Sequence, residues 1–223
     1  TDPYIQKAML TGVADEKVAV QAFNARLINR FIPKNTSHSI SDIVAFTEEL
    51  LHDYFAQHTA RLVNTLTLDP PAFLLDKDVG ERALTHRLAV HFESQFPGWD
   101  VDCDYDRLGD RTLRLPHGTI VSTDDHLAKS VYPDIVVHQR EVPNNLLAIE
   151  VRKAANHQPP AHDQQKLRAL TDPHLWFAYW IGVFLTLGRK QVTGAEIYTS
   201  GALNQTLSGW FAGRLRDAGL GAA

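Results

Sequence analysis

Two acidic residues, Asp134 and Glu150, stand inside apolar runs in the stretch VYPDIVVHQREVPNNLLAIEVRK, residues 131–153. Aspartate is depleted in strands, and a buried carboxylate is costly unless it is paired. The two apolar runs are separated by Pro143 and a pair of asparagines, which favours a β-hairpin. If the hairpin turns near Val142, Asp134 lies opposite Glu150 and both carboxylates share one face of the sheet.

Two like charges placed opposite one another in an apolar sheet need a positive group between them. A hard divalent cation, Mg²⁺ or Mn²⁺, binds carboxylate oxygens and leaves positions for phosphate oxygens, so we expect Asp134 and Glu150 to hold such an ion. Because side chains alternate along a strand, Arg152 lies on the same face as Glu150 and can bind a phosphate there. The opposing interpretation places both acids in water at strand ends, or in pairs with Arg152 and Lys153.

These residues also carry a family resemblance. Pro133-Asp134, then 15 intervening residues, then Glu150-Val151-Arg152 resembles the signature of the PD-(D/E)xK nuclease superfamily. Together with the later segment DQQKLRAL, the stretch is similar to a group of bacterial nuclease-like proteins within it. The resemblance covers about residues 78–190 and implies a restriction-endonuclease-like α/β fold, a mixed β-sheet flanked by helices.

The resemblance also implies roles for single residues. Glu81, on the first core helix, would help to hold the metal, and the backbone carbonyl of Val151 would add a ligand. The signature's lysine is Arg152 here, which keeps its charge and binds phosphate but cannot handle a proton as a lysine does. Three substitutes stay open: a metal-bound water that ionises with little help, Lys153 reoriented by a bulge, or Lys166 from the following helix. We favour Arg152 as a phosphate clamp and Lys166 as the substitute.

Apolar spacing and turn residues predict the elements around this site. We expect one helix over residues 5–31 and a second that starts near Ser39 or Ser41, which together form a helical hairpin over residues 1–70. The Pro70-Pro71 pair separates this hairpin from a nuclease-like domain over residues 71–223. In that domain we expect helices over 79–95, 161–171 and 203–218, strands over 99–105, 131–138, 146–152 and 192–199, and a loop over 107–130. Residues 175–187 favour a strand, with a buried helix as the alternative.

Composition limits the class of protein. A chain of 223 residues with 44% apolar residues can bury one substantial core. Its net charge of −4 does not attract nucleic acid, so binding a polyanion requires a local patch. The candidates for such a phosphate track are Arg107, Arg111, Arg114, Arg140, Arg152, Lys153, Lys166 and Arg168.

The cysteine count indicates the compartment, and a few further residues are candidates for the site. A single cysteine, Cys103, excludes an internal disulfide and a multi-cysteine zinc site, which fits the reducing cytoplasm. Neither a secretory signal nor an apolar stretch long enough to span a membrane is expected. Asp102 and Asp104 fit a solvated strand face, with Asp104-Tyr105 as a supporting or substrate-contacting pair near the cleft as the alternative. The aromatic cluster at Trp176, Phe177, Tyr179 and Trp180 fits the core better than a base-stacking surface.

We therefore expect a Mg²⁺- or Mn²⁺-dependent nuclease that hydrolyses phosphodiester bonds, with DNA favoured as substrate. Asp134 and Glu150 would hold the metal, and Arg152, Lys153 and Lys166 are the candidates for phosphate binding and proton handling. One alternative is a nuclease-fold module without catalysis that binds nucleic acid or a protein partner, because Arg152 replaces the lysine. A second alternative is an assembly protein that forms a homodimer through its N-terminal helices.

Overall fold

The computed structural model describes residues 7–11, 16–25, 27–28, 30–33, 40–68, 77, 79–108, 111–112, 132–189 and 191–221. The chain divides into two compact units, Thr1–Ala60 and Arg61–Ala223. The division falls inside a long helix, α2 (Ile40–Leu68), whereas the expected boundary was at residue 70. Each unit is described separately below.

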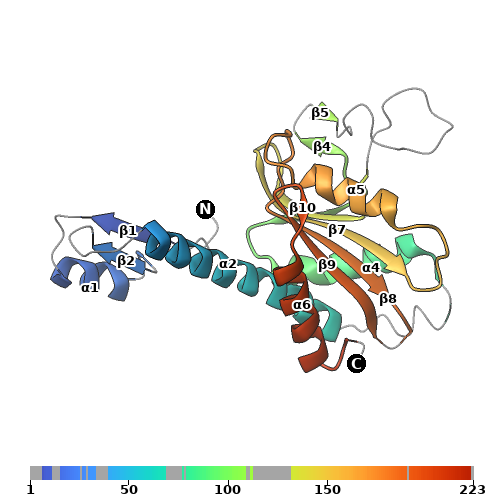
Figure 1. Ribbon diagram of the computed structural model, residues 1–223. Coiled ribbons are helices and arrows are strands. Elements are labelled where there is room, and N and C mark those ends of the chain that lie inside the picture. Colours follow the sequence, from blue (N-terminus) through green and yellow to red (C-terminus); the bar gives the residue numbers. More distant parts are fainter. Residues whose placement is uncertain are drawn as a thin grey trace. The chain divides into compact units, whose positions relative to one another are not determined.

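The first unit is not the expected helical hairpin. Its second helix is present as α2, but strands interrupt the first: β1 (Ala8–Thr11) and β2 (Arg30–Pro33) pair in parallel, and α1 (Glu16–Asn24) lies between them in sequence (Figure 1). Apolar residues spaced four or five apart over 5–31 predicted one helix, but short apolar runs fit a strand equally well. The prediction of a continuous helix over 5–31 was therefore wrong.

The second unit holds the candidate site and is a mixed α/β domain. Its helices are α4 (Glu81–Gln95), α5 (Ala161–Leu170) and α6 (Gln205–Asp217). The strands of its main sheet are β3 (Asp100–Cys103), β6 (Ile135–Gln139), β7 (Asn144–Lys153), β8 (Ile181–Leu187), β9 (Val192–Thr199) and β10 (Ala202–Leu203). A separate pair, β4 (Arg107–Leu108) and β5 (Arg111–Thr112), lies where a loop was expected.

The six strands of the main sheet follow the order β10-β9-β8-β7-β6-β3. β7 and β8 are parallel, and the other neighbours are antiparallel. Because β7 and β8 are joined by α5, the chain crosses over the sheet between them, as parallel neighbours require. The predicted α/β class with a mixed sheet flanked by helices is confirmed.

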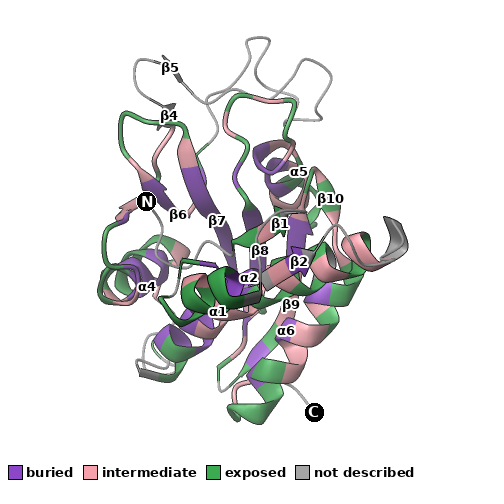
Figure 2. Cartoon of the chain, turned by 90° about the vertical axis from the view of Figure 1, so that its left-hand side faces the viewer, coloured by how far each residue is buried: buried purple, intermediate pink, exposed green. Residues whose placement is uncertain are grey.

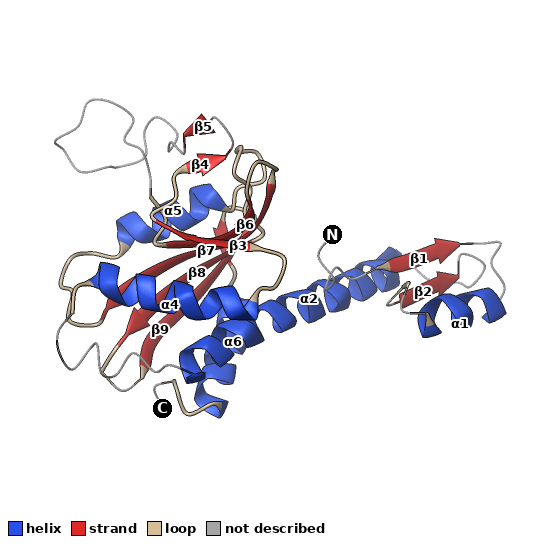
Figure 3. Ribbon diagram, turned by 180° about the vertical axis from the view of Figure 1, so that it is seen from behind, coloured by secondary structure: helices blue, strands red, loops and turns tan. Residues whose placement is uncertain are grey.

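Helices α4 and α5 cover opposite faces of this sheet (Figures 1 and 3). Leu167 and Leu170 of α5 pack in one buried cluster with Val136, Ala148 and Phe184 of three neighbouring strands. On the other face, α4 buries Leu84, Leu88 and Phe92, while α6 lies along β9. The strands between these helices are coloured mostly as buried (Figure 2), because a sheet that is covered on both faces exposes neither set of its side chains.

One expected strand begins later than predicted. Residues 175–187 were expected to form a strand, but β8 starts only at Ile181. The backbone before it is held in an irregular path, since Tyr179 N–H donates to the Leu170 carbonyl and Trp180 N–H to that of Asn145. Ala178 has φ of 34°, a left-handed value that no regular strand contains. In this connection Tyr179 is buried, whereas Trp176 and Trp180 are exposed.

Among the described residues, the helices are all too short or too polar to cross a membrane.

Candidate functional site

The β6–β7 hairpin brings the two acids together in the expected register. Ile135 faces Ile149 and Val136 faces Ala148, the pairs that a turn centred near Val142 requires. A bulge between Val137 and His138 shifts the pairing register, and this shift affects only the part of the hairpin near the turn. The predicted hairpin register at the site is therefore confirmed.

Asp134 lies one residue before β6 and its side chain continues the ladder. Its Oδ2 atom accepts a hydrogen bond of 2.7 Å from the backbone N–H of Val151. β6 begins only at Ile135, so the Asp134 side chain takes the place of a strand carbonyl at this position. This bond fixes the Asp134 carboxylate beside β7, next to the residue that follows Glu150. The carbonyl proposed as a metal ligand belongs to the same Val151 residue.

Glu150 is held by a lysine from the opposite helix. Its side chain is only 2% exposed, and its Oε2 atom accepts a short hydrogen bond from Lys166 Nζ of α5. Its other oxygen, Oε1, is buried without a hydrogen-bond partner among the described residues. One oxygen of this carboxylate is therefore satisfied and the other is available to a ligand.

Asp163 of α5 extends the site to Arg152. Its Oδ1 atom lies 3.5 Å from Lys166 Nζ, and its Oδ2 atom lies 3.7 Å from Arg152 Nη1. Arg152 also donates to the side-chain and main-chain oxygens of Asn156, at 3.2 and 3.3 Å. Arg152 and Lys166 thus join the acids in one network, as predicted, but Arg152 is already engaged by Asp163 and Asn156.

Glu81 and Lys153 lie apart from the carboxylate pair. Glu81 Oε1 accepts from the backbone N–H of Lys153 at 3.0 Å and from Asn156 Nδ2 at 3.1 Å. Lys153 Nζ donates to the Val79 carbonyl at the start of α4, on the sheet face opposite α5. Within the part of the chain that the structure describes, the hydrogen bond to Asn156 links Glu81 to Arg152, and Lys153 Nζ is bound to Val79.

Burial dominates the electrostatics of the two acids. It raises the pKa of Asp134 to about 6, although the Val151 N–H and the nearby Lys166 oppose the shift. Burial, with Asp134 as a second cause, also raises the pKa of Glu150 well above its ordinary value. Two adjacent carboxylates in a poorly solvated site resist carrying charge together unless a cation joins them.

Lys166 is that cation in the metal-free protein. Burial is the largest single cause and lowers its pKa, but Glu150, Asp163 and Asp134 together raise the pKa, and the net direction is upward. Nζ lies within reach of three oxygens, on Glu150, Asp163 and the Tyr132 carbonyl. This set of acceptors favours the charged ammonium, so Lys166 and Glu150 form a buried ion pair.

The residues present fit a divalent ion held by two carboxylates. Within the part of the chain that the structure describes, no group of three histidine, cysteine or acidic side chains is placed to hold a metal. Mg²⁺ can be bound through one or two carboxylates plus water and substrate phosphate, so a third acid is not required. The buried, unpartnered Oε1 of Glu150 supplies the oxygen that such an ion needs.

A second polar group, at the turn end of the same hairpin, was missed from the sequence. Asp102 accepts from His138 Nε2 at 2.9 Å and forms a two-point pair with Arg140. Tyr105 packs edge-on against the His138 ring at 4.6 Å. The expectation that Asp102 only faces solvent was wrong, because the cross-strand neighbours of β3 lie 36 and 38 residues away in sequence.

The remaining candidates are scattered. Trp176 and Trp180 are 67% and 55% exposed, whereas Tyr179 is buried. The side chains of Arg107 and Arg111, and the whole of Arg114, lie outside the described residues, so the proposed phosphate track is not tested.

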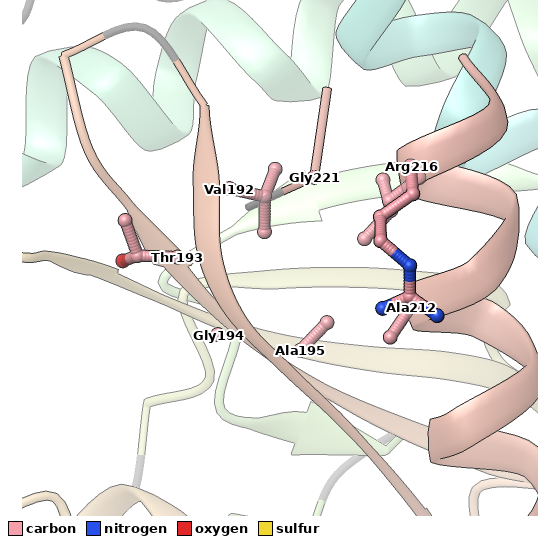
Figure 4. A pocket seen from close by; sticks show the side chains of 8 residues that line it. Val192, Thr193, Gly194, Ala195, Ala212, Arg216 and Gly221 are labelled. Carbon is pink, nitrogen blue, oxygen red and sulfur yellow. The ribbon is translucent and has the colours of Figure 1, made fainter. Parts of the chain in front are cut away.

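A pocket of about 200 Å³ lies elsewhere in the domain, between β9 and α6 (Figure 4). Arg216 and Leu215 of α6 line it together with Thr193 and Ala195 of β9. None of the residues that line this pocket belongs to the carboxylate site.

No protein-family model matches the chain, and no curated protein matches it in sequence. The functional assignment therefore depends on the geometry of the site and on the signature resemblance.

Proposed function

We propose that this protein is a divalent-metal-dependent nuclease of the PD-(D/E)xK type. The observation that carries the proposal is that Asp134 is fixed on Val151, the residue next to Glu150, and that one buried oxygen of Glu150 has no hydrogen-bond partner among the described residues. Glu150 is buried and Asp134 is partly buried, and removing two carboxylates from water is costly even where Lys166 pairs with one of them. A cation that bridges them gives their burial a reason.

Each residue has a defined part in the proposed hydrolysis. Asp134 and Glu150 would bind Mg²⁺ or Mn²⁺, with the Val151 carbonyl as a further oxygen. The ion, once bound, would supply Lewis-acid stabilisation and a more acidic water. Arg152 would contact the scissile phosphate and offset the negative charge that develops in the transition state.

Lys166 is the lysine that the signature position lacks. It lies on α5 and not on β7, but its Nζ reaches Glu150. An ammonium beside the metal-binding acids can neutralise phosphate and exchange a proton with water, which an arginine cannot do. We therefore propose that Lys166 takes the role of the signature lysine while Arg152 binds phosphate.

A module that binds nucleic acid without cleaving it is the second candidate. Arg152 is occupied by Asp163 and Asn156, and in the described ranges the site has two acids where a three-ligand group would be a stronger metal site. In this alternative the network is structural, and the protein binds nucleic acid in the absence and presence of metal alike.

The choice of DNA as substrate, and of the cytoplasm as compartment, rests on the resemblance. The single cysteine, Cys103, is unpaired and half-buried. A free thiol is compatible with a reducing compartment.

A cleavage assay distinguishes the two candidates. The purified protein is incubated with single- and double-stranded DNA and RNA in Mg²⁺, Mn²⁺ or a chelator, beside Asp134→Ala, Glu150→Ala and the exposed control Asp217→Ala. We expect metal-dependent cleavage of DNA by the parent and the control, and a loss of roughly 100-fold or more in the two site variants. Cleavage that survives both site substitutions would refute the site, and binding without cleavage by the parent would favour the second candidate.

A further inference from the structure

Lys166 is surrounded by acceptors at the site. Its ammonium group has three hydrogens to donate, and three oxygens surround it: Glu150 Oε2, Asp163 Oδ1 at 3.5 Å and the Tyr132 carbonyl at 3.5 Å. The contact with Glu150 is short, and the other two are long. Lys166 therefore has two further acceptors within a small movement of its present position.

Asp163 is placed to hold both cations of the network. Each of its oxygens faces a different one, Oδ1 toward Lys166 and Oδ2 toward Arg152. It lies three residues before Lys166 on α5, so the helix itself keeps their side chains adjacent. The backbone of α5 keeps the two residues one turn apart whether or not Lys166 contacts Glu150.

The charges of the site change when a divalent ion arrives. Asp134, Glu150 and Asp163 carry up to three negative charges against the two positive charges of Lys166 and Arg152. A divalent ion at Asp134 and Glu150 would repel the ammonium that now contacts Glu150. Because an unpaired buried charge is strongly destabilising, Lys166 needs another acceptor at that moment.

We propose that Lys166 is the internal cation of the metal-free site, and that Asp163 is the positioning residue that retains Lys166 when a divalent ion takes Glu150. The ion would enter at the unpartnered Oε1 side of Glu150, beside Asp134. Lys166 would then leave Oε2 and remain on Asp163, next to the metal. This inference rests on the proposed metal-binding function of the same two acids.

The exchange has two consequences for the proposed enzyme. The carboxylates stay compensated before metal binds, so the empty site does not unfold the sheet. After metal binds, Asp163 keeps the ammonium at the edge of the site, where a phosphate can accept its hydrogens. A lysine at the signature position on β7 would be kept near the metal by its strand. Lys166 lies on α5 and needs Asp163 to keep its ammonium there.

The exchange can be observed directly in the parent protein. The side-chain ammonium signals of ¹⁵N-labelled lysines are followed during a Mg²⁺ titration, and crystals are compared with and without Mn²⁺. We expect one ion at Asp134 and Glu150, with Lys166 Nζ released from Glu150 and within hydrogen-bond distance of Asp163 Oδ1. An ion bound while Lys166 remains on Glu150, or Lys166 released from both acids, overturns the proposal, as does the absence of any bound ion.

A double-mutant cycle tests the role of Asp163. Mn²⁺ affinity is measured by calorimetry for the parent, Asp163→Asn, Lys166→Met and the double variant, with Arg214→Met on α6 as the control. We expect Asp163→Asn to weaken Mn²⁺ binding about tenfold in the parent but less than about twofold in the Lys166→Met background. Equal losses in both backgrounds would show that Asp163 acts only through its own charge and would overturn its positioning role.

The two proposals can fail separately. Exchange of Lys166 without DNA cleavage would preserve this inference and refute the nuclease. DNA cleavage while Lys166 stays bound to Glu150 would support the nuclease and refute this inference. If Lys166→Met does not fold, as judged by circular dichroism, the lysine signals and crystals of the parent still decide the outcome.

Discussion

At the scale of single residues, the site is an arrangement of buried charges that the fold tolerates at a cost. Burial raises the pKa of Asp134 to about 6, which means that ionising this acid is harder in the folded chain than in the unfolded chain. Glu150 shares this property and is compensated by Lys166. Sites that bind ligands often contain such destabilising groups, which are relieved when the ligand arrives.

Asp134→Asn is expected to stabilise the metal-free protein near neutral pH. An acid whose folded pKa is raised stabilises the fold below its unfolded pKa, near 3.8, and that contribution is lost as the pH rises through about 6. Asparagine keeps an acceptor for Val151 N–H without the charge. We expect a gain of up to about 3 kcal/mol in unfolding free energy at pH 7.5 and little gain at pH 4.

Urea unfolding at the two pH values, in chelator, measures this difference. Asp217→Asn is a suitable control because Asp217 is 71% exposed on α6. Mg²⁺ should reduce the difference in unfolding free energy between the parent and Asp134→Asn, because the ion binds the Asp134 carboxylate and therefore stabilises only the parent. A variant less stable than the parent at pH 7.5 would contradict the assigned pKa shift.

Lys166 and Arg152 are expected to respond differently to substitution. Lys166→Met removes the lysine of the site and should lower the cleavage rate about 100-fold or more. Arg152→Lys keeps the charge but loses the fork that contacts both Asp163 and Asn156, so we expect a loss of less than about tenfold. Single-turnover cleavage in Mg²⁺ measures both. A rate gain in Arg152→Lys would instead show that proton handling is limiting and that Lys166 does not provide it.

At the scale of the elements, the site depends on where β6 ends and where α5 crosses. β6 begins at Ile135, so Val151 of β7 has no backbone partner there and binds the Asp134 side chain. α5 then covers the same face and presents Asp163 and Lys166 to Glu150. Glu81, at the start of α4, ties that helix to the end of β7 from the other face.

Glu81 is expected to matter for stability more than for metal binding. Glu81→Ala leaves the N–H of Lys153 and the amide of Asn156 without their acceptor and should cost about 1–2 kcal/mol in unfolding free energy. Glu81→Gln retains an acceptor oxygen and should cost less. We expect Mn²⁺ affinity to stay within about threefold of the parent in both. A loss of tenfold or more in both variants would return Glu81 to the metal site.

At the scale of the whole molecule, the first unit has an exposed apolar surface that the carboxylate site does not explain. Val18, Val20 and Phe23 of α1 are each about half exposed or more, and Leu27 is 62% exposed. Val20 and Phe23 are three residues apart on α1, which places them on one side of the helix, and Leu27 follows shortly after the helix ends. An apolar stripe of this kind commonly marks an interaction surface. A homodimer through the N-terminal helices stays a prediction.

Phe23→Glu tests this prediction, because it places a charge in the centre of the stripe. If α1 forms a homodimer, light scattering after size exclusion should show a dimer for the parent and a monomer for Phe23→Glu. Gln21→Glu, at an exposed polar position outside the stripe on the same helix, should remain dimeric. A monomeric parent over a wide range of concentration would refute the dimer and leave the surface to another partner.

The sequence determined the class of fold, the β6–β7 hairpin and the meeting of Asp134 with Glu150. The hairpin and the placement of the two acids follow from local rules, the two-residue period of a strand and the position of a turn, whereas the mixed sheet flanked by helices was implied by the family resemblance. It did not determine the first unit, since the apolar spacing over 5–31 is compatible with helix and with short strands.

Only the tertiary structure decided which charges meet at the site. The sequence spacing of Glu150 and Lys166 does not show that α5 packs on β7 at the position where these two side chains meet. Nor does it show that Arg152 contacts Asp163 and Asn156. The three-residue spacing of Asp163 and Lys166 on one helix was a signal that could have linked these two residues in advance. Long side chains reach several partners, and packing of the helix on the sheet selects among them.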